Sequence, residues 1–145
     1  MENCIFCRIV KGEIPAAKVY EDDLVLAFLD IAPINYGHVL VIPKEHHESS
    51  STIPEATAGR MFRIGSRIGI ALKRKLDYDG FNLHLADGAS AGQVVMHAHL
   101  HVVPRGVEDG FHWNWRQLKY PEGKLAETAA TLAAKLADDL GGAGK

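Results

Sequence analysis

Residues 97–103 of this 145-residue chain read His97-Ala98-His99-Leu100-His101-Val102-Val103, and this alternation decides how the centre of the chain folds. Successive side chains of a β-strand point to opposite faces. The alternation therefore predicts a strand with histidines on one face and apolar residues on the core face. Neighbouring histidines on such a face lie about 6.6 Å apart. Three alternating imidazoles would repel one another if all were protonated, so the pattern indicates that their ring nitrogens have a use.

The alternating histidines have two chemical uses to compare. They can bind a metal ion, with a further protein ligand or water completing the shell. Alternatively, one imidazole is a nucleophile while its neighbours orient it and donate hydrogen bonds to a charged oxygen. The loop just upstream, Gly88-Ala89-Ser90-Ala91-Gly92-Gln93, is small and flexible enough to bring backbone N–H groups close to a phosphate. Beside the histidine strand, it favours the nucleophile reading.

The rest of the chain predicts an α+β domain in which an antiparallel meander of about five strands carries segregated helices. A threonine cap at Thr52, Pro54 and Glu55 predict the start of a long central helix. The expected strands are 18–20, 24–29, 38–42, 81–85 and 98–103, and a C-terminal helix covers 125–140. The expected buried stripe of the central helix is Ala58, Met61, Phe62, Gly65, Ile68, Gly69, Leu72 and Leu76.

Composition and length predict a single domain over residues 1–145, with a frayed tail at 141–145. The formal net charge of −2 does not favour a nucleic-acid polymer as partner. No apolar run approaches the roughly 20 residues of a membrane span. The acidic N-terminus lacks the pattern of a secretory signal, and there are only two cysteines, so we expect a cytoplasmic protein without a disulfide scaffold.

The segment Gly92-Gln93-Val94-Val95-Met96-His97-Ala98-His99-Leu100-His101-Val102-Val103-Pro104-Arg105 resembles the signature of the histidine triad (HIT) family of nucleotide hydrolases and transferases. The N-terminal half resembles bacterial members of that family in four further segments. They are 4–7 (CIFC), 18–22 (KVYED), 27–31 (AFLDI) and 37–46 (GHVLVIPKEH). The resemblance implies a HIT-like fold, a purine nucleotide ligand such as AMP or GMP, and a homodimer whose sheets continue across the two-fold axis. The region 113–115 would then lie near the dimer interface or the substrate.

The resemblance also assigns roles to individual residues. His99 matches the histidine that attacks the α-phosphorus and forms a nucleotidyl-histidine intermediate, which water then cleaves. His101 would donate to a phosphate oxygen or fix the nucleophile, and His38 matches a fourth histidine near the triad. Asp30 would hold the ribose hydroxyls, although a strand-ending turn is its alternative role. Phe6, Phe28 and Ile31 would sandwich the base, with plain core packing as the alternative, and Asp87, Gly92, Gln93 and Val94 complete the expected substrate site.

Two positions depart from the family pattern. Ala86 aligns with an asparagine or glutamine in characterised branches, and Val94 stands where many members carry serine or threonine. Each change removes a hydrogen-bonding group from the site. The loss of one donor at a developing charge can cost roughly 3 kcal/mol, so these positions predict reduced or redirected activity.

The pair Cys4-x-x-Cys7 has three readings: a redox motif, two small buried residues, or half of a zinc site. The redox reading lacks the preceding strand of a βαβ unit. The resemblance implies a structural zinc bound by Cys4, Cys7, His46 and His97, with His47 as a rival ligand. The resemblance counts His97 among the catalytic histidines, and the zinc site would give it a structural role in place of phosphate chemistry; no cofactor is expected for catalysis. His84 and His112 are expected to be ordinary surface or half-buried histidines.

Three hypotheses follow for the function. The first is a hydrolase acting at the α-phosphate of a nucleoside phosphoramidate or a dinucleoside polyphosphate. The second is a nucleotide-binding regulator with little turnover, motivated by Ala86 and Val94. The third is a metalloenzyme that uses the histidine strand as its ligand set.

Overall fold

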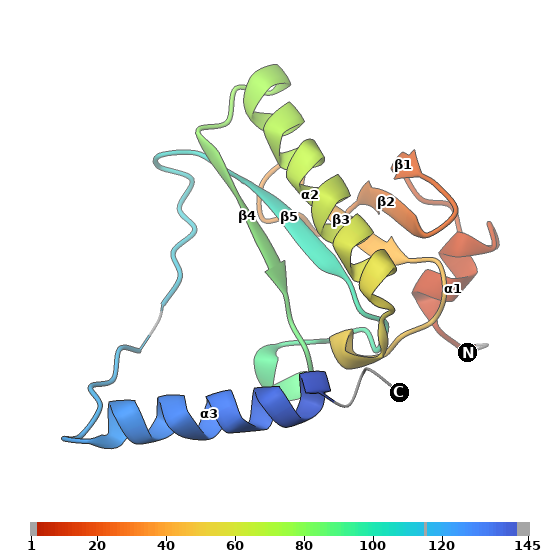
Figure 1. The fold of residues 1–145 in the computed structure, drawn as a ribbon. Coiled ribbons are helices and arrows are strands. Elements are labelled where there is room, and N and C mark those ends of the chain that lie inside the picture. The colour runs from red at the N-terminus through yellow and green to blue at the C-terminus, as the bar shows by residue number, and fades with distance from the viewer. Residues whose placement is uncertain (1–2, 115, 142–145) are drawn as a thin grey trace. The chain divides into compact units, whose positions relative to one another are not determined.

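A five-stranded antiparallel sheet forms the centre of the computed structural model, which describes residues 3–114 and 116–141. The strand order is β1-β2-β3-β5-β4, and Figure 1 shows the elements with their labels. This confirms the expected α+β fold on an antiparallel sheet. The strands are β1 (Lys18–Glu21), β2 (Val25–Leu29), β3 (Val39–Pro43), β4 (Gly80–Leu85) and β5 (Leu100–Arg105).

The order departs from a simple meander after β3. The long helix α2 (Glu55–Lys75) carries the chain away, and β4 then returns at the edge of the sheet, so that β5 fits between β3 and β4. As a result, β5 has a partner on each side: His101 lies opposite Leu40 of β3 and opposite His84 of β4. Strand β5, which carries His101, is therefore held from both sides, whereas His97 and His99 precede the strand, which begins two residues later than predicted.

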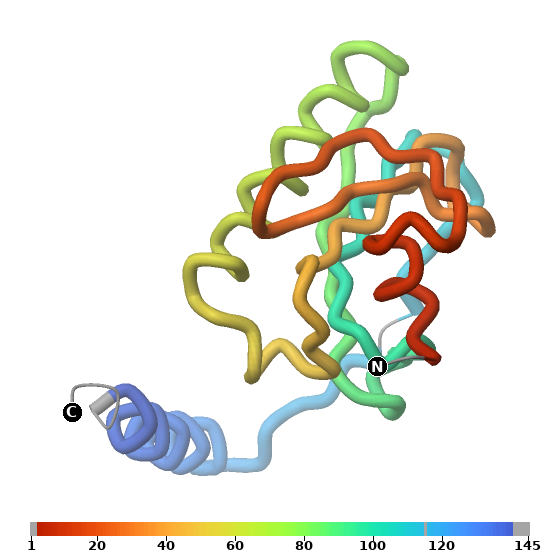
Figure 2. The backbone as a smooth tube through the Cα atoms, turned by 90° about the vertical axis from the view of Figure 1, so that its right-hand side faces the viewer, coloured from red at the N-terminus to blue at the C-terminus, as the bar shows by residue number. Residues whose placement is uncertain are grey.

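The sheet has two covered faces, and the alternation of β2, β3 and β5 distributes their side chains between them. Ala98, Leu100 and Val102 join the cluster under α2, as the sequence predicted, so the histidines belong to the opposite face. That opposite face packs a second cluster around Phe6 and Phe28. Figure 2 shows α2 in yellow-green and the N-terminal segment in red on opposite sides of the strands.

Helix α2 begins at Glu55, three residues after the predicted cap. A short 3-10 turn occupies Ser50–Thr52, and Pro54 with φ −56° and ψ 142° is the N-cap residue. A residue before proline is driven out of the helical region, which explains why Ile53 is extended and helix α2 starts only beyond it. Gly69 lets α2 approach the sheet, because a Cβ there would lie 2.4 Å from the Phe81 ring.

Some predicted boundaries and burial assignments were wrong. Strand β5 runs through Pro104, which pairs with Phe81 instead of ending the strand. Ala58 is exposed, and Phe62 and Leu76, the residue after α2, are 61% and 56% exposed, so the buried stripe excludes these three positions. Thr57 and Ile64, which the predicted stripe omits, are buried there.

Two helices complete the described chain. Helix α1 (Ile5–Val10) was not expected from the sequence, whereas α3 (Lys124–Gly141) confirms the predicted C-terminal helix. The chain divides into two compact units, Met1–Phe111 and His112–Lys145, and each is described by itself. Most of the predicted frayed tail, and Trp115, lie outside the described residues. None of the helices in the described ranges is long and apolar enough to cross a membrane.

Candidate active site

His99 lies just before β5, with its ring nitrogens in two different environments. Its Nδ1 lies 2.7 Å from the backbone carbonyl oxygen of His97, which can only accept, so Nδ1 carries the proton and donates it. A neutral imidazole with Nδ1–H has a free lone pair on Nε2. His99 is 6% exposed and lines a pocket of about 670 Å³. A backbone contact thus leaves Nε2 as the nitrogen with the lone pair in the neutral ring, which is the state that a nucleophilic imidazole needs.

A directional string of hydrogen bonds fixes the protons of His38 and His101. The backbone N–H of Ile34 donates to Nδ1 of His38 at 3.2 Å, which leaves the proton of His38 on Nε2. That Nε2–H lies 2.9 Å from Nδ1 of His101 and donates to it. His101, neutral and accepting at Nδ1, carries its proton on Nε2. The string therefore ends in one N–H donor on a residue that lines the pocket.

Burial and neighbouring histidines keep this string uncharged. Burial lowers the pKa of His101 to about 3, with smaller contributions from the rings of His99, His84 and His38. Burial also lowers the pKa of His38, against the opposing effect of Asp30. His101 can thus act as a neutral hydrogen-bond donor at neutral pH.

His84 is a neighbour that the sequence did not identify. Its ring stacks on His101 with centroids 4.7 Å apart and an interplanar angle of 22°. It is half-buried, as expected, but the cross-strand register of β4 and β5 brings it against the triad. Only that register, which the sequence pattern does not contain, places the two rings together.

Asp30, His38 and His101 offer ligand atoms within 4.8 Å of one another, a spacing that suits a metal ion. The hydrogen bonds oppose this use, because a metal on Nε2 of His38 requires the proton on Nδ1. That proton would face the N–H of Ile34, which already donates to Nδ1. The cluster therefore favours hydrogen-bonded histidines over the metalloenzyme reading.

A pocket of about 670 Å³ opens beside His99 and His101, within the usual size of ligand sites. Six of the residues that were expected to contact substrate line this pocket. They come from α1, from β2 and the turn after it, and from the loop before β5. They are Phe6, Phe28, Asp30, Ile31, Gly92 and Val94. The sequence missed other lining residues, among them Ile5, Ile9, Pro15, Ala16 and Ala17, because α1 and the segment after it were not expected there.

The aromatic residues of the pocket have a core role as well as a pocket role. Phe6 is 7% exposed and meets Phe28 edge-on at 5.6 Å and His99 edge-on at 5.3 Å between ring centroids. Ile31, in contrast, is 99% exposed at the rim. Asp30 forms a turn by accepting the N–H of Ala32 on Oδ1, at 2.8 Å. The core packing given as the alternative for Phe6 and Phe28 and the turn given for Asp30 are therefore observed, and all three residues also line the pocket.

Two expected substrate contacts are used elsewhere. Gln93 is 4% exposed: its amide donates to the carbonyls of Glu48 and Val95 and accepts the N–H of Gly88. The carboxylate of Asp87 accepts from Ser49 and Ser50, whose hydrogen bonds lower its pKa. Neither side chain lines the pocket, and both brace the loop around it.

The loop reaches the pocket through its glycine and its valine. Gly92 has φ +93°, a conformation that residues with a Cβ adopt only with strain. Val94 is 88% exposed and lines the pocket with an apolar side chain. Ala86 is buried and is not among the lining residues.

His97 is fully buried and is not among the residues that line the pocket. Its Nε2 lies 2.9 Å from the carbonyl oxygen of Pro43 and donates to it, which leaves the Nδ1 lone pair free. That lone pair faces Cys4 Sγ at 3.5 Å and Cys7 Sγ at 3.6 Å, and Cys7 Sγ lies 3.3 Å from His46 Nδ1. Two thiols and two imidazoles with their ligand atoms within 4.8 Å of one another suit tetrahedral zinc.

The rival ligand His47 has other contacts. Its Nδ1 lies 3.3 Å from the hydroxyl of Thr52, and its carbonyl oxygen accepts the N–H of Ala98 at 2.6 Å. His46 therefore belongs to the cysteine cluster, while His47 supports the backbone next to His97. His112 is exposed.

Comparison with known proteins gives a family match over residues 11–107, to the HIT domain. Protein hit of Bacillus subtilis is 42% identical over 139 residues, covering 94% of this chain and 96% of that protein. Adenylylsulfatase HINT3 of Arabidopsis thaliana is 37% identical over 132 residues, covering 91% of this chain and 66% of the plant protein. The relatives therefore include a hydrolase.

Three solved structures share the fold. A HIT family protein from Bacillus anthracis has a TM-score of 0.86 at 42% identity, covering 92% of this chain and 97% of that one. A histidine triad nucleotide-binding protein from Candida albicans has a TM-score of 0.84 at 34% identity, covering 94% and 99%. A zinc-bound histidine triad family protein from Mycobacterium smegmatis has a TM-score of 0.74 at 40% identity, covering 92% and 98%. The chain belongs to the HIT family.

Proposed function

We propose that the protein hydrolyses purine nucleotide conjugates at the α-phosphate through a nucleotidyl intermediate on His99. The observation that supports this proposal is the bond from Nδ1–H of His99 to the carbonyl of His97, which makes Nε2 the nitrogen with the lone pair in the neutral ring of a residue that lines a 670 Å³ pocket. A neutral imidazole whose tautomer is fixed in advance is a competent nucleophile at neutral pH.

The reaction proceeds in two displacements. The Nε2 lone pair of His99 forms a bond to the α-phosphorus, while the bond from phosphorus to the leaving group breaks and that group takes the bonding electrons and a proton from solvent. A water oxygen then attacks the phosphorus, the P–N bond breaks, and its electrons return to Nε2. The proton that the water loses goes to solvent, and nucleoside monophosphate is released.

His101 stabilises the charge on the transferring phosphoryl group. Its Nε2–H, the end of the string from Ile34 through His38, donates to a phosphoryl oxygen. A donor that is already oriented needs no reorganisation when charge develops. Asp30, which keeps Oδ2 free of the turn bond, accepts from the ribose hydroxyls, and the apolar wall around Phe6 and Phe28 takes the base.

The leaving group is an amine, as in a nucleoside phosphoramidate, or a phosphate, as in a dinucleoside polyphosphate. A relative named adenylylsulfatase supports cleavage next to an adenylyl phosphorus with a third kind of leaving group. The apolar Val94 at the rim offers no hydroxyl to a leaving group, which favours substrates that do not depend on a donor there.

A hydrolysis assay tests the proposal. Adenosine phosphoramidate, diadenosine polyphosphate and adenylyl sulfate are incubated with the wild type, His99→Ala and the control His112→Ala, which removes an exposed histidine of the other unit. We expect AMP release by the wild type and the control, and none from His99→Ala. Release by His99→Ala at the wild-type rate would contradict the proposal.

A nucleotide-binding regulator is the second candidate, because Val94 removes a hydroxyl from the site. It predicts that AMP binds while none of the three substrates turns over. Calorimetric titration with AMP beside the assay separates the two functions.

We also infer a structural zinc bound by Cys4, Cys7, His46 and His97, and the zinc-bound relative from Mycobacterium smegmatis supports it. Bound there, the metal would crosslink the start of α1 to the segment before β5. It takes no part in the displacement steps. Metal analysis of the purified protein is expected to give one zinc per chain.

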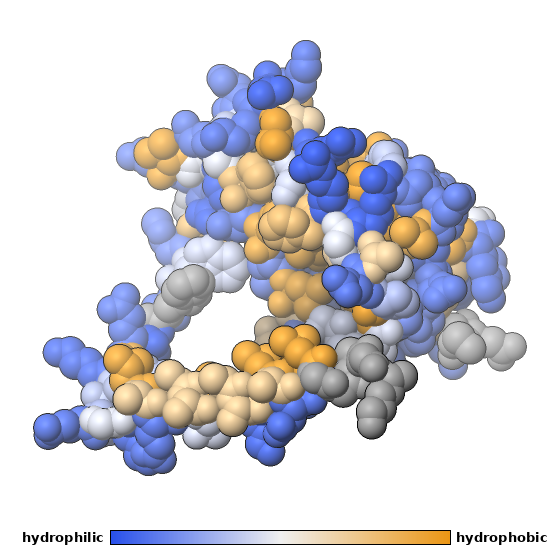
Figure 3. All heavy atoms as spheres, in the orientation of Figure 1, coloured by the Kyte–Doolittle hydropathy of each residue, from blue (hydrophilic) through white to orange (hydrophobic). Residues whose placement is uncertain are grey.

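The apolar surfaces of the chain support a homodimer. Strand β4 is an edge strand, and Phe62 of α2 beside it is 61% exposed. Helix α3 carries a leucine stripe that is more than half exposed, and Figure 3 shows the apolar residues along it. The stripe is Leu125, Leu132, Leu136 and Leu140. Sedimentation equilibrium is expected to give twice the chain mass, and Leu132→Asp with Leu136→Asp is expected to weaken association.

A further inference from the structure

The turn that carries Ile34 and Asn35 lies at the surface and needs an anchor. Ile34 is 39% exposed and Tyr36 is 87% exposed. Within the turn, the N–H of His38 donates to the carbonyl of Asn35 at 3.0 Å, and Gly37 supplies a positive φ of +95°. The position of the Ile34 N–H, which sets the tautomer of His38, therefore depends on what holds this turn.

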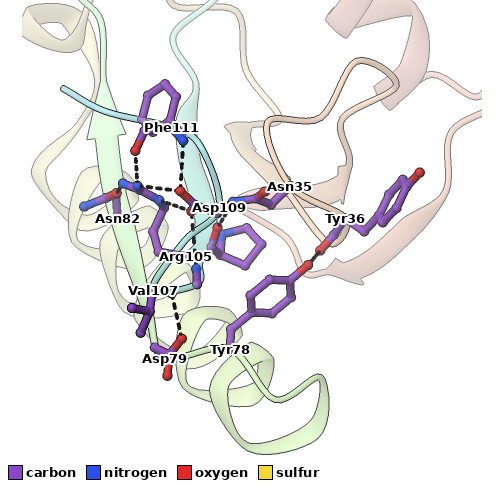
Figure 4. Close-up of polar contacts among 11 residues, drawn as sticks. Asn35, Tyr36, Tyr78, Asp79, Asn82, Arg105, Val107, Asp109 and Phe111 are labelled. Atoms are coloured by element: carbon purple, nitrogen blue, oxygen red, sulfur yellow. Dashed lines mark hydrogen bonds and ion pairs between the residues drawn. The ribbon is translucent and has the colours of Figure 1, made fainter. Parts of the chain in front are cut away.

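The side chain of Asn35 is that anchor. Its Nδ2 donates to the carbonyl oxygen of Pro104 and to Oδ2 of Asp109, both at 2.8 Å (Figure 4). A second bond reaches the turn from Tyr78, whose hydroxyl donates to the carbonyl of Tyr36 at 2.6 Å. Of these two side chains, Asn35 alone ties the turn to the end of β5.

Asp109 is itself held rigidly. Arg105 donates to it from Nε at 2.6 Å and from Nη2 at 3.0 Å, and this pair lowers the pKa of the carboxyl. The backbone N–H groups of Gly106 and Phe111 also donate to the carboxylate, whose side chain is 8% exposed. Arg105 reaches Asn82 of β4 as well, at 2.8 Å from Nη1. A two-pronged arginine–carboxylate pair of this kind fixes geometry as well as charge.

These contacts close a ring that begins and ends on β5. Arg105 holds Asp109, Asp109 holds Asn35, and the turn of Asn35 presents the Ile34 N–H to His38, which donates to His101. We propose that Asn35 is a positioning residue, which sets through this ring the nitrogen on which His101 carries its proton. This inference rests on the proposed function for its effect on rate, but not for its effect on the imidazoles.

The tautomer matters because it decides what His101 offers to a phosphate. Without the Ile34 N–H in place, the proton of His38 can move to Nδ1, and its Nε2 then becomes an acceptor. His101 would have to donate from Nδ1 to satisfy it, leaving a lone pair on Nε2. A lone pair directed at a phosphoryl oxygen repels it, so a donor would become an unfavourable contact.

The test compares Asn35→Ala with Asn82→Ala in the zinc-loaded protein. Asn82 is the matched control, because it is bonded to Arg105 but not to the turn. Nitrogen-15 spectra of the imidazoles report which nitrogen of His38 and His101 is protonated. We expect Asn35→Ala to mix or reverse both tautomers and to lower kcat by about 10- to 100-fold, as for other outer partners of site histidines. Asn82→Ala is expected to keep both tautomers and most of kcat.

Unchanged tautomers in Asn35→Ala would overturn the proposal, and so would the same change in both variants. If the tautomers change as expected but the wild type hydrolyses nothing, the positioning role stands and the proposed function fails. Should Asn35→Ala not fold, Asn35→Ser is measured in its place. A serine hydroxyl is too short to bond Pro104 and Asp109 together, so the same tautomer change is expected.

Discussion

His97 and His101 stand on either side of His99, each two residues away, yet the fold gives them opposite tasks. His97 donates from Nε2 to the carbonyl of Pro43 and turns its Nδ1 lone pair to two cysteines. His101 accepts at Nδ1 from His38 and keeps Nε2–H as a donor in the pocket. In the proposed function, one end of the histidine run would bind a cation and the other end would meet an anion.

Residue type and spacing therefore do not decide what a histidine does. Its hydrogen-bond partners decide it, and here they come from the end of β3 on one side and from the turn before β3 on the other. Between them, His99 takes its proton position from the backbone of His97. The proposed nucleophile thus takes its orientation from the backbone of the residue whose ring faces the cysteine cluster.

Removing a ligand of the proposed zinc site is expected to have the largest effect. In Cys7→Ser, zinc binding is weakened, and a ligand present at about 1,000 times its Kd stabilises a fold by roughly 4 kcal/mol. We expect urea unfolding to show a loss of that order and metal analysis to show less than one zinc per chain. Retention of wild-type stability and zinc content would show that the cysteine cluster is not a metal site.

Replacing His101, the proposed donor to the phosphate, is expected to lower the turnover rate but not the stability of the fold. His101→Gln keeps a polar side chain but breaks the string from His38, and the loss of one oriented donor costs about 100-fold in kcat. Zinc content and the urea midpoint are expected to stay close to those of the wild type. Loss of zinc together with activity in this variant would contradict the separate roles proposed for His97 and His101.

Periodicity and turn chemistry predicted much of this fold. The alternation at 98–102 placed the core side chains correctly, and the apolar segments gave five strands and two helices. They did not give α1, whose six residues are too few to show a helical period. The sequence pattern also could not show that β5 fits between β3 and β4, because strand order depends on where α2 returns the chain.

The sequence predicted which residues form the candidate site, but not which ring nitrogens of its histidines carry the protons. The structure brings His38, His99, His101 and Asp30 together and gathers the cysteine cluster with His46. It uses both Gln93 and Asp87 to brace the loop: the buried Gln93 takes backbone partners, as buried polar groups do, and the exposed Asp87 accepts hydrogen bonds from Ser49 and Ser50. Pro43, Ile34 and His97 contribute through backbone atoms, which no residue pattern identifies.

The brace at Gln93 gives an intermediate prediction. Gln93→Leu leaves the Gly88 N–H and the Glu48 and Val95 carbonyls without their partner, and one unsatisfied buried group costs about 1 to 3 kcal/mol. We expect a loss of that size in urea unfolding and a higher KM, since the loop lines the pocket through Gly92. If stability falls while KM is unchanged, the hydrogen bonds of Gln93 serve folding and not substrate binding.

Per pH unit, the smallest expected effect is a dependence of stability on pH that belongs to His101. Its pKa is lowered from 6.5 to about 3 in the folded protein, so the unfolded chain binds the proton first as the pH falls. This contribution is complete above the ordinary pKa and is lost as the pH falls through the window toward 3, by at most about 1.4 kcal/mol per pH unit. Urea midpoints across this window are expected to fall more steeply for the wild type than for His101→Gln. Equal slopes would contradict a neutral His101.

The attack of His99 on the α-phosphorus can be tested by mass spectrometry. The protein is quenched in acid-free denaturant during turnover of adenosine phosphoramidate. We predict an adenylyl adduct on the peptide that contains His99, present in the wild type and absent in His99→Ala. An adduct on another residue, or rapid AMP release with no adduct in a protein that binds substrate, would contradict attack by His99.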